Sequence, residues 1–173
     1  MIELILGGAR SGKSRLAEQT ADASGLAVTY VATSQPLDTA MAERIAHHRD
    51  RRPAHWALIE EPVALAEALL RSARDDRCIL IDCLTLWLTN LLLHDDPQRL
   101  AIERAALVDV LPTLPGHIIM VSNETGLGVV PLGELSRRYV DEAGMLHQTL
   151  AGLSDRVTFC VAGLPMILKG ERR

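Results

Sequence analysis

The sequence predicts an α/β domain in which helices cover both faces of a mainly parallel sheet. Short apolar runs of strand length alternate with helical patterns along almost the whole chain, and this alternation is typical of a parallel sheet covered by helices. Most of the short runs are continuously apolar, as strands buried on both faces are. The first run, residues 2–6, leads directly into a glycine-rich segment.

The strands are predicted from apolar runs that end at turn residues or acids. They cover residues 2–6, 27–32, 56–59, 78–81, 117–121, 157–162 and 166–169. The run at 27–32, A-V-T-Y-V-A, is rich in β-branched residues, which favour strands. The run at 78–81, C-I-L-I, ends at Asp82.

The helices are predicted from amphipathic or largely apolar segments of the right length. They cover residues 14–24, 38–51, 63–70, 84–93, 98–110 and 135–153. Gly25 ends the first helix, Asp38 can cap the second and Pro53 limits it. Pro62 is expected in the first turn of the third helix. Residues 84–93 are apolar on most sides, which indicates a buried helix, and Trp87 is expected in the core or at a subunit contact.

Composition excludes several classes of protein. A chain of 173 residues, nearly half of them apolar, is expected to form one domain, residues 1–173. A net charge of −4 and only two Trp, two Tyr and one Phe argue against a nucleic-acid partner. Cys78, Cys83 and Cys160 form no C-x-x-C pair, which favours free thiols in a reducing compartment. No leader precedes the first strand and no long apolar run exists, so a cytoplasmic location without a membrane span is expected.

The glycine-rich segment fits the phosphate-binding pattern G-x-x-x-x-G-K-S/T. It comprises Gly7, Gly8, Ala9, Arg10, Ser11, Gly12, Lys13 and Ser14. A strand that ends in such a loop and continues as a helix directs several backbone N–H groups at one anion. Lys13 is then expected to reach the β- and γ-phosphates of a nucleoside triphosphate, and Ser14 to hold Mg²⁺. A chance glycine-rich turn is the alternative, which the strand–loop–helix order disfavours.

Other polar residues follow the predicted strands, where ligands of such sheets bind. Asp82 has the position of a carboxylate that supports the metal ion in a P-loop protein, or it caps the next helix. Thr33, Ser34 and Gln35 contact phosphate or ribose, or form a plain polar loop. After the strand at 117–121, Asn123 and Glu124 orient a substrate hydroxyl or a metal-bound water, or belong to an ordinary turn.

The predicted helix at 38–51 carries two adjacent histidines. Their side chains point about 100° apart, so they occupy different environments. His48 extends the apolar stripe of Met41 and Ile45 and is expected to pack. His47 lies on the polar side, where a neutral imidazole can act as a nucleophile. Helix pattern alone leaves a solvated surface histidine as the commoner interpretation of His47.

Together these segments resemble the bifunctional adenosylcobinamide kinase / adenosylcobinamide-phosphate guanylyltransferase family of cobalamin biosynthesis. The matching pieces, in the family's order, are G-G-A-R-S-G-K-S at Gly7, Y-V-A-T-S at Tyr30, R-I-A-H-H-R at Arg44, I-D-C-L-T-L-W-L-T-N-L at Ile81, V-S-N-E-T-G-L-G-V-V-P at Val121 and A-G-L-P at Ala162. The H-H and S-N-E-x-G-x-G-x-V-P segments are far more specific than the phosphate loop.

The resemblance implies a RecA-like P-loop fold, a homotrimer and two reactions. ATP or GTP phosphorylates adenosylcobinamide, a corrinoid, and GTP then donates GMP to give adenosylcobinamide-GDP and pyrophosphate. The first histidine of the pair, here His47, becomes guanylylated, and Mg²⁺ is held at Ser14 and Asp82. Contacts with GTP are implied for Thr33, Ser34, Gln35, His48, Arg49, Asp50, Arg51, Glu60 and Asp82.

The chain departs from the family pattern at two places. Thr125 stands where the family usually has Val after S-N-E, and Tyr139-Val140 stands where relatives often carry Phe-Arg. The second change affects the expected corrinoid pocket rather than the nucleotide site. Two other functions fit the phosphate loop alone: a small-molecule kinase without guanylyl transfer, and a regulatory P-loop NTPase that serves a partner.

Overall fold

The computed structural model describes residues 1–35 and 53–171. The predicted helix at 38–51 lies outside the described residues, and with it His47, His48, Arg49, Asp50 and Arg51. None of the helices in the two described segments is long and apolar enough to cross a membrane.

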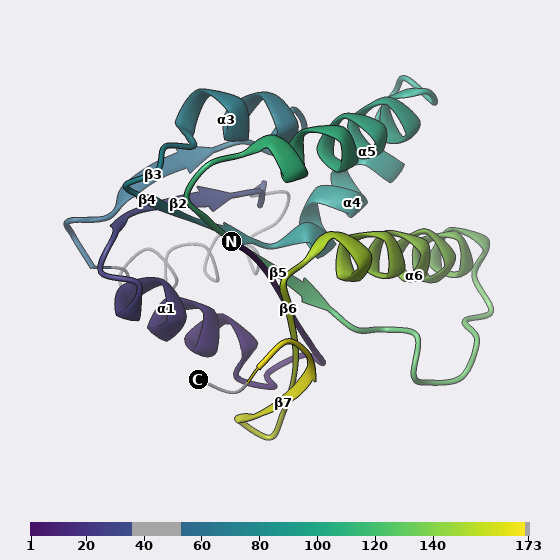
Figure 1. Cartoon of the computed structure of the whole chain (residues 1–173). Coiled ribbons are helices and arrows are strands. Elements are labelled where there is room, and N and C mark those ends of the chain that lie inside the picture. The colour runs from purple at the N-terminus through teal and green to yellow at the C-terminus, as the bar shows by residue number, and fades with distance from the viewer. Residues whose placement is uncertain (36–52, 172–173) are drawn as a thin grey trace.

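The described residues form one seven-stranded sheet in the order β3-β2-β4-β5-β1-β6-β7 (Figure 1). Its strands are β1 (Ile2–Gly7), β2 (Ala27–Ala32), β3 (Ala57–Glu60), β4 (Arg77–Asp82), β5 (His117–Asn123), β6 (Arg156–Val161) and β7 (Leu164–Lys169). Every neighbouring pair is parallel except β6–β7, which is an antiparallel hairpin. The mainly parallel sheet predicted from the sequence is confirmed.

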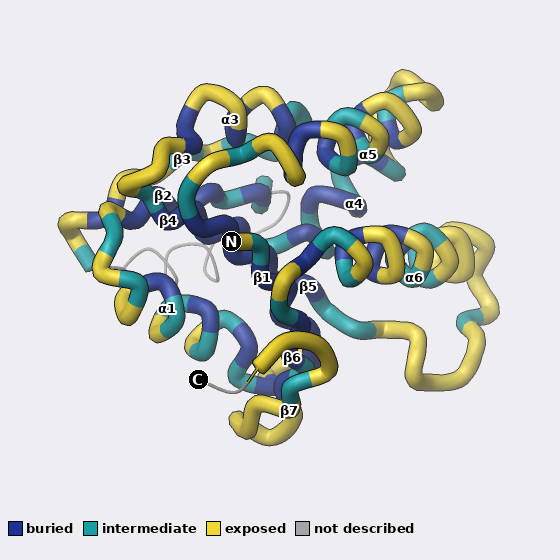
Figure 2. Tube along the Cα trace, viewed as in Figure 1, coloured by how far each residue is buried: buried dark blue, intermediate teal, exposed yellow. Residues whose placement is uncertain are grey.

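Helices cover both faces of the sheet, as predicted (Figure 1). They are α1 (Lys13–Ala23), α3 (Leu65–Ser72), α4 (Leu84–Leu92), α5 (Arg99–Val110) and α6 (Glu134–Leu153), with a 3₁₀ turn at Leu111–Thr113. On one face, α1 packs its buried Ala17 and Ala21 against Ile5 and Leu80 of the sheet. On the other face lie α3, α4, α5 and α6, so the buried side of each helix faces the sheet (Figure 2).

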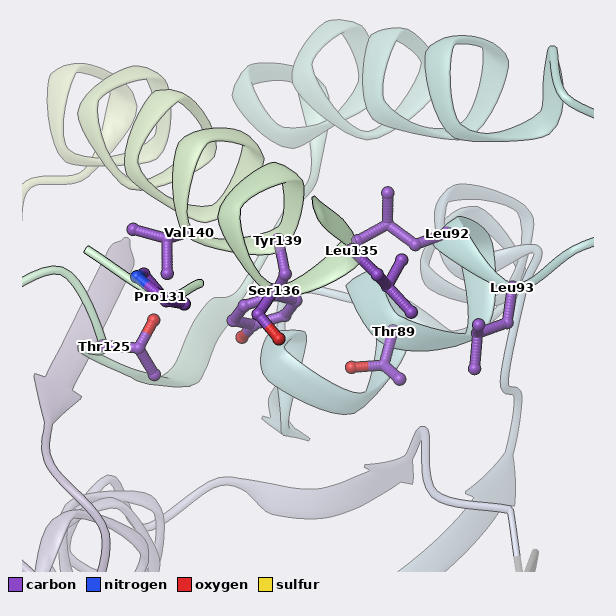
Figure 3. A pocket seen from close by; sticks show the side chains of 9 residues that line it. All are labelled: Thr89, Leu92, Leu93, Thr125, Pro131, Leu135, Ser136, Tyr139 and Val140. Carbon is purple, nitrogen blue, oxygen red and sulfur yellow. The ribbon is translucent and has the colours of Figure 1, made fainter. Parts of the chain in front are cut away.

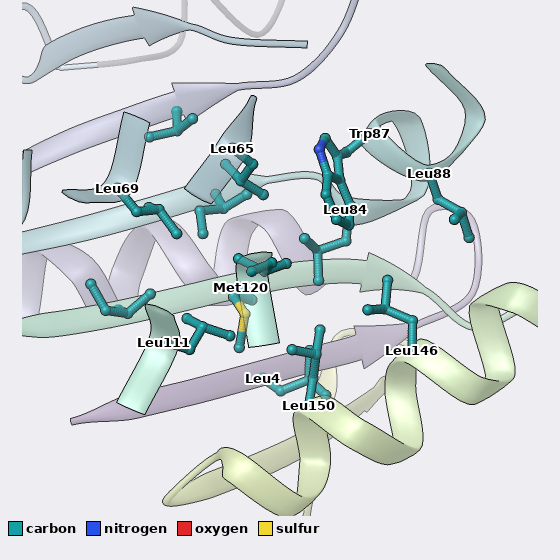
Figure 4. Packing of buried hydrophobic residues seen from close by; sticks show 14 of the residues in the cluster. Leu4, Leu65, Leu69, Leu84, Trp87, Leu88, Leu111, Met120, Leu146 and Leu150 are labelled. Carbon is teal, nitrogen blue, oxygen red and sulfur yellow. The ribbon is translucent and has the colours of Figure 1, made fainter. Parts of the chain in front are cut away.

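The larger core lies between the sheet and these four helices (Figure 4). Trp87 of α4 is fully buried there, and its indole Nε1 donates to the carbonyl oxygen of Val63 at 2.8 Å. Because the indole N–H has a partner, the ring is buried without an unsatisfied donor. Trp87 is therefore a core residue rather than a subunit contact.

The start of α3 differs from the prediction. Pro62 is not in its first turn, because the helix begins at Leu65. The side chain of Glu61 explains the delay, since its Oε1 accepts from the backbone N–H groups of Val63 and Ala64 at 3.0 and 2.8 Å. A carboxylate that satisfies these donors holds the chain in a turn before the helix begins.

Strand register brings the predicted polar residues to one edge of the sheet. Ala32 of β2 pairs with Asp82 of β4, and Gly7 of β1 pairs with Asn123 of β5. Glu60, the last residue of β3, also pairs with Ala32. Residues far apart in sequence therefore meet at the carboxyl edge, where parallel sheets of this kind bind ligands.

Candidate functional site

The loop between β1 and α1 has the geometry of an anion-binding cradle. Arg10 and Gly12 both have positive φ, 55° and 95°, on either side of Ser11. Left-handed residues in such a loop turn successive N–H groups to the same side, which creates a pocket for an anion. Gly12 is also the N-cap of α1, so the positive end of the helix dipole lies at the loop.

Lys13 and Ser14 occupy the first turn of α1 beside this loop. The Nζ of Lys13 donates to the carbonyl oxygen of Gly8 at 3.2 Å, and the residue is only 9 % exposed. The buried hydroxyl Oγ of Ser11 has no hydrogen-bond partner among the described residues. Buried polar atoms are rarely left unpaired, so a positive charge and an unused hydroxyl at this loop both suit a phosphate ligand.

Gly7 is required by the packing of the loop. A Cβ at this position would lie 2.5 Å from Ser11 Oγ and 2.6 Å from the backbone oxygen of Cys160. We expect Gly7→Ala to lower the free energy of unfolding by about 1–3 kcal/mol, because the backbone must move to admit the methyl group. Urea unfolding without nucleotide measures this. Gly8→Ala is the matched control, since a Cβ there meets nothing within 4 Å; equal losses in the two variants would contradict the explanation.

Asp82 ends β4 at the carboxyl edge, next to the central strand β5. The alternative role, a cap for the next helix, is wrong, because the N-cap of α4 is Cys83 and no side chain caps this helix. Between the ends of β4 and β1 lies the end of β5, where the buried Oδ1 of Asn123 has no partner among the described residues. Hydroxyl, carboxylate and amide oxygens at Ser14, Asp82 and Asn123 are the hard ligands that Mg²⁺ prefers.

Softer metals fit the described residues less well. Among them there is no group of three or more His, Cys, Asp or Glu side chains that could hold a metal ion. All three cysteines are free. Burial raises the pKa of Cys78 and Cys83 to about 11, so both thiols stay protonated near neutral pH. A site with one carboxylate, completed by phosphate oxygens and water, is typical of Mg²⁺.

The structure gives Thr33 a structural role. Its side chain is fully buried, and its hydroxyl donates to the carbonyl oxygen of Cys83 at 2.6 Å and accepts from the same residue's N–H at 3.0 Å. The carbonyl oxygen of Thr33 accepts from Asn90 Nδ2 at 2.8 Å. Thr33 therefore joins the ends of β2 and β4, and its hydroxyl is already used within the protein. Ser34 and Gln35 follow it and are half-buried at the same edge.

A hydrogen-bonded chain of side chains supports the end of β5. His147 Nε2 and Ser122 Oγ lie 2.8 Å apart, and Ser122 Oγ lies 3.4 Å from Thr85 Oγ1. Thr85 Oγ1 in turn accepts from the N–H of Asn123 at 2.7 Å. The N–H of Glu124 donates to the carbonyl oxygen of Gly7 at 3.1 Å. These hydrogen-bonded side chains therefore join α4, β5 and α6 next to the phosphate loop.

Glu124 has a structural role in addition to the one predicted. Its Oε1 accepts from the N–H of Gly126 at 2.5 Å, and its Oε2 lies 3.5 Å from His147 Nδ1. The second distance is that of an ion pair only when His147 is protonated. Burial lowers the pKa of His147, so the ring is uncharged near neutral pH, and Nδ1 makes no hydrogen bond. The turn interpretation of this segment is therefore correct in part, and a substrate role for Asn123 and Glu124 stays a prediction.

Sequence reasoning missed His147. The available signal was its place on the apolar face of α6, where Ala143, Leu146, His147 and Leu150 are the buried residues. A histidine in such a stripe is usually a packed residue with a partner, and nothing in the sequence says that the partner is Ser122. Only the packing of α6 against β5 reveals the contact.

His147 gives the protein a predictable dependence of stability on pH. Burial lowers its pKa, and the nearby Glu124 carboxylate offsets this only in part. Since the folded pKa lies below the unfolded value of about 6.5, the unfolded state binds more protons in acid. The free energy of unfolding should therefore hold above about pH 6.5 and fall as the pH drops below it.

Urea unfolding at about pH 7.5 and about pH 5.5, on either side of the unfolded pKa, measures this effect. His147→Gln keeps a group that can bond Ser122 but cannot titrate. We expect the loss of stability between the two pH values to be smaller in this variant than in the wild type. An identical loss in both proteins would show that other groups cause it.

A pocket of about 320 Å³ opens beside this edge (Figure 3). Its walls are α4, the loop after β5 and the first turns of α6. They contribute Thr89, Leu92, Leu93, Thr125, Pro131, Leu135, Ser136, Tyr139 and Val140. Both departures from the family pattern, Thr125 and Val140, therefore line the same pocket.

Comparison with known families agrees with the site. The family model for cobinamide kinase / cobinamide phosphate guanyltransferase matches residues 3–168. The chain belongs to this family. It is 70 % identical over 171 residues to the bifunctional adenosylcobalamin biosynthesis protein CobP of Pseudomonas aeruginosa, with 99 % of each chain covered. It is 40 % identical to CobU of Salmonella typhimurium, covering 98 % of this chain and 100 % of that one.

The fold of this member of the cobinamide kinase family is also found in more distant proteins. The RadB recombinase superposes with a TM-score of 0.53 at 17 % identity, covering 91 % of this chain and 73 % of that one. At this identity the likeness concerns the fold alone. It confirms the predicted RecA-like P-loop sheet.

Proposed function

We propose that the chain is a single catalytic domain that phosphorylates adenosylcobinamide with ATP or GTP. It then transfers GMP from GTP to adenosylcobinamide phosphate, giving adenosylcobinamide-GDP. The observation that carries this proposal is the phosphate loop from Gly7 to Ser14, in a chain that matches the cobinamide kinase family over residues 3–168. Most of the polar residues that are expected to act with this loop, and that the structure describes, lie at the carboxyl edge of the sheet.

In the first reaction, the loop binds the triphosphate through its N–H groups and through Lys13. As the γ-phosphoryl group moves to the substrate hydroxyl, charge on the phosphate oxygens is stabilised by the ammonium group and the helix N-terminus. Mg²⁺ held by Ser14 and Asp82 would neutralise further phosphate charge. Asn123 and Glu124, at the end of β5, are proposed to orient the substrate hydroxyl.

In the second reaction, His47 is the proposed nucleophile. An imidazole nitrogen attacks the α-phosphorus of GTP, so a P–N bond forms as the bond to the pyrophosphate oxygen breaks. A phosphate oxygen of adenosylcobinamide phosphate then attacks the same phosphorus and releases the histidine. The two steps avoid a direct attack by one anion on another. A neutral imidazole suits this role because its ordinary pKa lies near 6.5.

The remaining GTP contacts follow from the family resemblance. They are proposed for Ser34, Gln35, His48, Arg49, Asp50, Arg51 and Glu60, in addition to the loop and Asp82. Glu60 ends β3 at the carboxyl edge, which is compatible with a nucleotide lying along the ends of β1, β4 and β2. Thr33 is not included, because the residue is fully buried and its hydroxyl and carbonyl oxygen bond within the protein.

Turnover of adenosylcobinamide, followed by product mass, tests the proposed function. The protein is incubated with adenosylcobinamide and Mg²⁺ together with ATP, GTP or both. We expect the phosphate ester with either nucleotide that feeds the kinase step, and the GDP derivative only when GTP is present. Formation of the ester without any GDP derivative would favour a kinase that lacks guanylyl transfer.

We further propose a homotrimer in a reducing, cytoplasmic compartment. Leu164, Met166 and Leu168 alternate along β7 and are each more than half exposed. Residues two apart lie on one face of a strand, and grouped exposed apolar side chains often mark an interface. The unpaired cysteines suit the compartment. Sedimentation equilibrium measures the assembly, and a monomer at every concentration would contradict it.

A further inference from the structure

The pocket beside the carboxyl edge has the chemistry of a site for an uncharged, apolar ligand. Six of its nine lining residues are apolar or aromatic, and none is charged. The other three, Thr89, Thr125 and Ser136, carry hydroxyl groups, as does the aromatic Tyr139. Tyr139 adds no charge, because burial raises its pKa to about 12. Phosphates in proteins are commonly bound by cationic side chains, and no cationic side chain lines this pocket, so the lining does not suit a nucleotide.

The pocket lies within reach of the phosphate loop. Thr125, in its wall, directly follows Glu124, whose N–H donates to the carbonyl oxygen of Gly7 at 3.1 Å. Consecutive Cα atoms are about 3.8 Å apart. On the opposite wall, Thr89 follows Thr85 by four residues, which is about 6 Å along the axis of α4. Thr85 in turn accepts a hydrogen bond from the N–H of Asn123. A molecule seated in the pocket can therefore extend a short arm to the γ-phosphate.

We propose that this pocket binds the apolar rim of the corrin ring of the substrate, and so holds the hydroxyl-bearing arm beside the phosphate loop. The inference rests on the proposed function. The rim of a corrinoid carries methyl groups and uncharged amides, which match the apolar walls and the hydroxyls of Thr89, Thr125 and Ser136. About 320 Å³ is at the lower end of ligand pockets, roughly 300–1,000 Å³, so the pocket encloses part of the macrocycle.

The surroundings of the pocket provide for the rest of the ring. Leu93 and Leu135 line it and are 55 % and 50 % exposed, and Leu132 beside them is 97 % exposed. Leu93 and Leu135 therefore continue the apolar wall of the pocket to the surface (Figure 3), and Leu132 follows the lining residue Pro131 in the chain. A broad, flat ligand can cover them, which explains why they are apolar at the surface.

Filling the pocket tests the proposal. Val140→Phe and Ser136→Phe each add a large side chain to a lining position, while Gln148→Phe adds the same side chain to an exposed position of α6 outside the pocket. We expect both pocket variants to raise the KM for adenosylcobinamide by about tenfold or more, with the control unchanged. Labelling of the protein by GTP without corrinoid should stay at the wild-type level in all three.

Several outcomes would overturn the proposal. An unchanged KM for adenosylcobinamide in both pocket variants would do so. An altered oligomeric state with an unchanged KM would show that a second copy of the chain covers this surface instead. Loss of GTP labelling in both pocket variants would place the pocket in the nucleotide site. If the wild-type protein converts no adenosylcobinamide, the proposed function itself fails. The wild-type protein alone shows this outcome, so it is distinguished from a failure of the pocket proposal.

Discussion

His47→Ala is expected to abolish the covalent adduct between the protein and GMP, and with it the formation of adenosylcobinamide-GDP. Without the imidazole no side chain in this position can displace pyrophosphate, because alanine has no lone pair to form the P–N bond. The kinase reaction should persist, since it uses the phosphate loop and not the histidine. Separating the two reactions makes this a stronger test than loss of overall activity.

The measurement uses GTP labelled at the α-phosphate, without corrinoid. Wild-type protein should retain label that is labile in acid and stable in base, as a phosphorus–nitrogen bond is. His94→Ala is the matched control, because His94 is exposed beyond the end of α4, far along the chain from His47. A fully labelled His47→Ala variant would end the assignment of His47. Absence of label even in the wild type would favour a direct transfer.

Lys13→Met is expected to lower both reactions by at least about 10²–10³-fold, the loss typical of removing one donor from a developing oxyanion. The Nζ of Lys13 lies over the loop at the N-terminus of α1, 3.2 Å from the oxygen of Gly8. Both nucleotides are proposed to bind in this loop, so both reactions lose the same charge. Methionine keeps the length and packing of the side chain but not the ammonium group.

Steady-state rates of ester formation and of GMP transfer measure the effect. Lys169→Met is the matched control, since it removes the same charge from β7, where Nζ contacts the carbonyl oxygens of Ala151 and Gly152. We expect this variant to keep both activities. Loss of only one reaction in Lys13→Met would show that the two reactions use different phosphate sites, and retention of both would remove the loop from the mechanism.

Local patterns predicted most of the fold correctly. The run at 27–32 became β2 with the same bounds, and 84–93 became α4 to within one residue. Such segments are predictable because burial on both faces requires a continuous apolar run. The predicted start of α3 was wrong, because the preference of Pro62 for a first turn was overridden by the hydrogen bonds that the Glu61 carboxylate accepts from Val63 and Ala64. Such bonds depend on where a side chain points, which periodicity does not reveal.

The candidate site divides in the same way. The phosphate loop was predictable because its function requires particular residues at fixed spacing along the chain. The role of Thr33 was not, because its hydroxyl is bound by Cys83, fifty residues away. The contact between His147 and Ser122 was not predicted, for the same reason. Contacts between distant segments depend on strand order and helix packing, and a single sequence does not display these.

By itself, the sequence determined that this chain is an α/β protein with a phosphate loop, because hydrophobic periodicity and loop glycines act over a few neighbouring residues. Only the tertiary structure decided that Asp82 is not a helix cap, that Thr33 joins two strands, and that Thr125 and Val140 share one pocket. The sheet order places β4, β5 and β1 side by side, and residues separated by many tens of positions then meet at one edge.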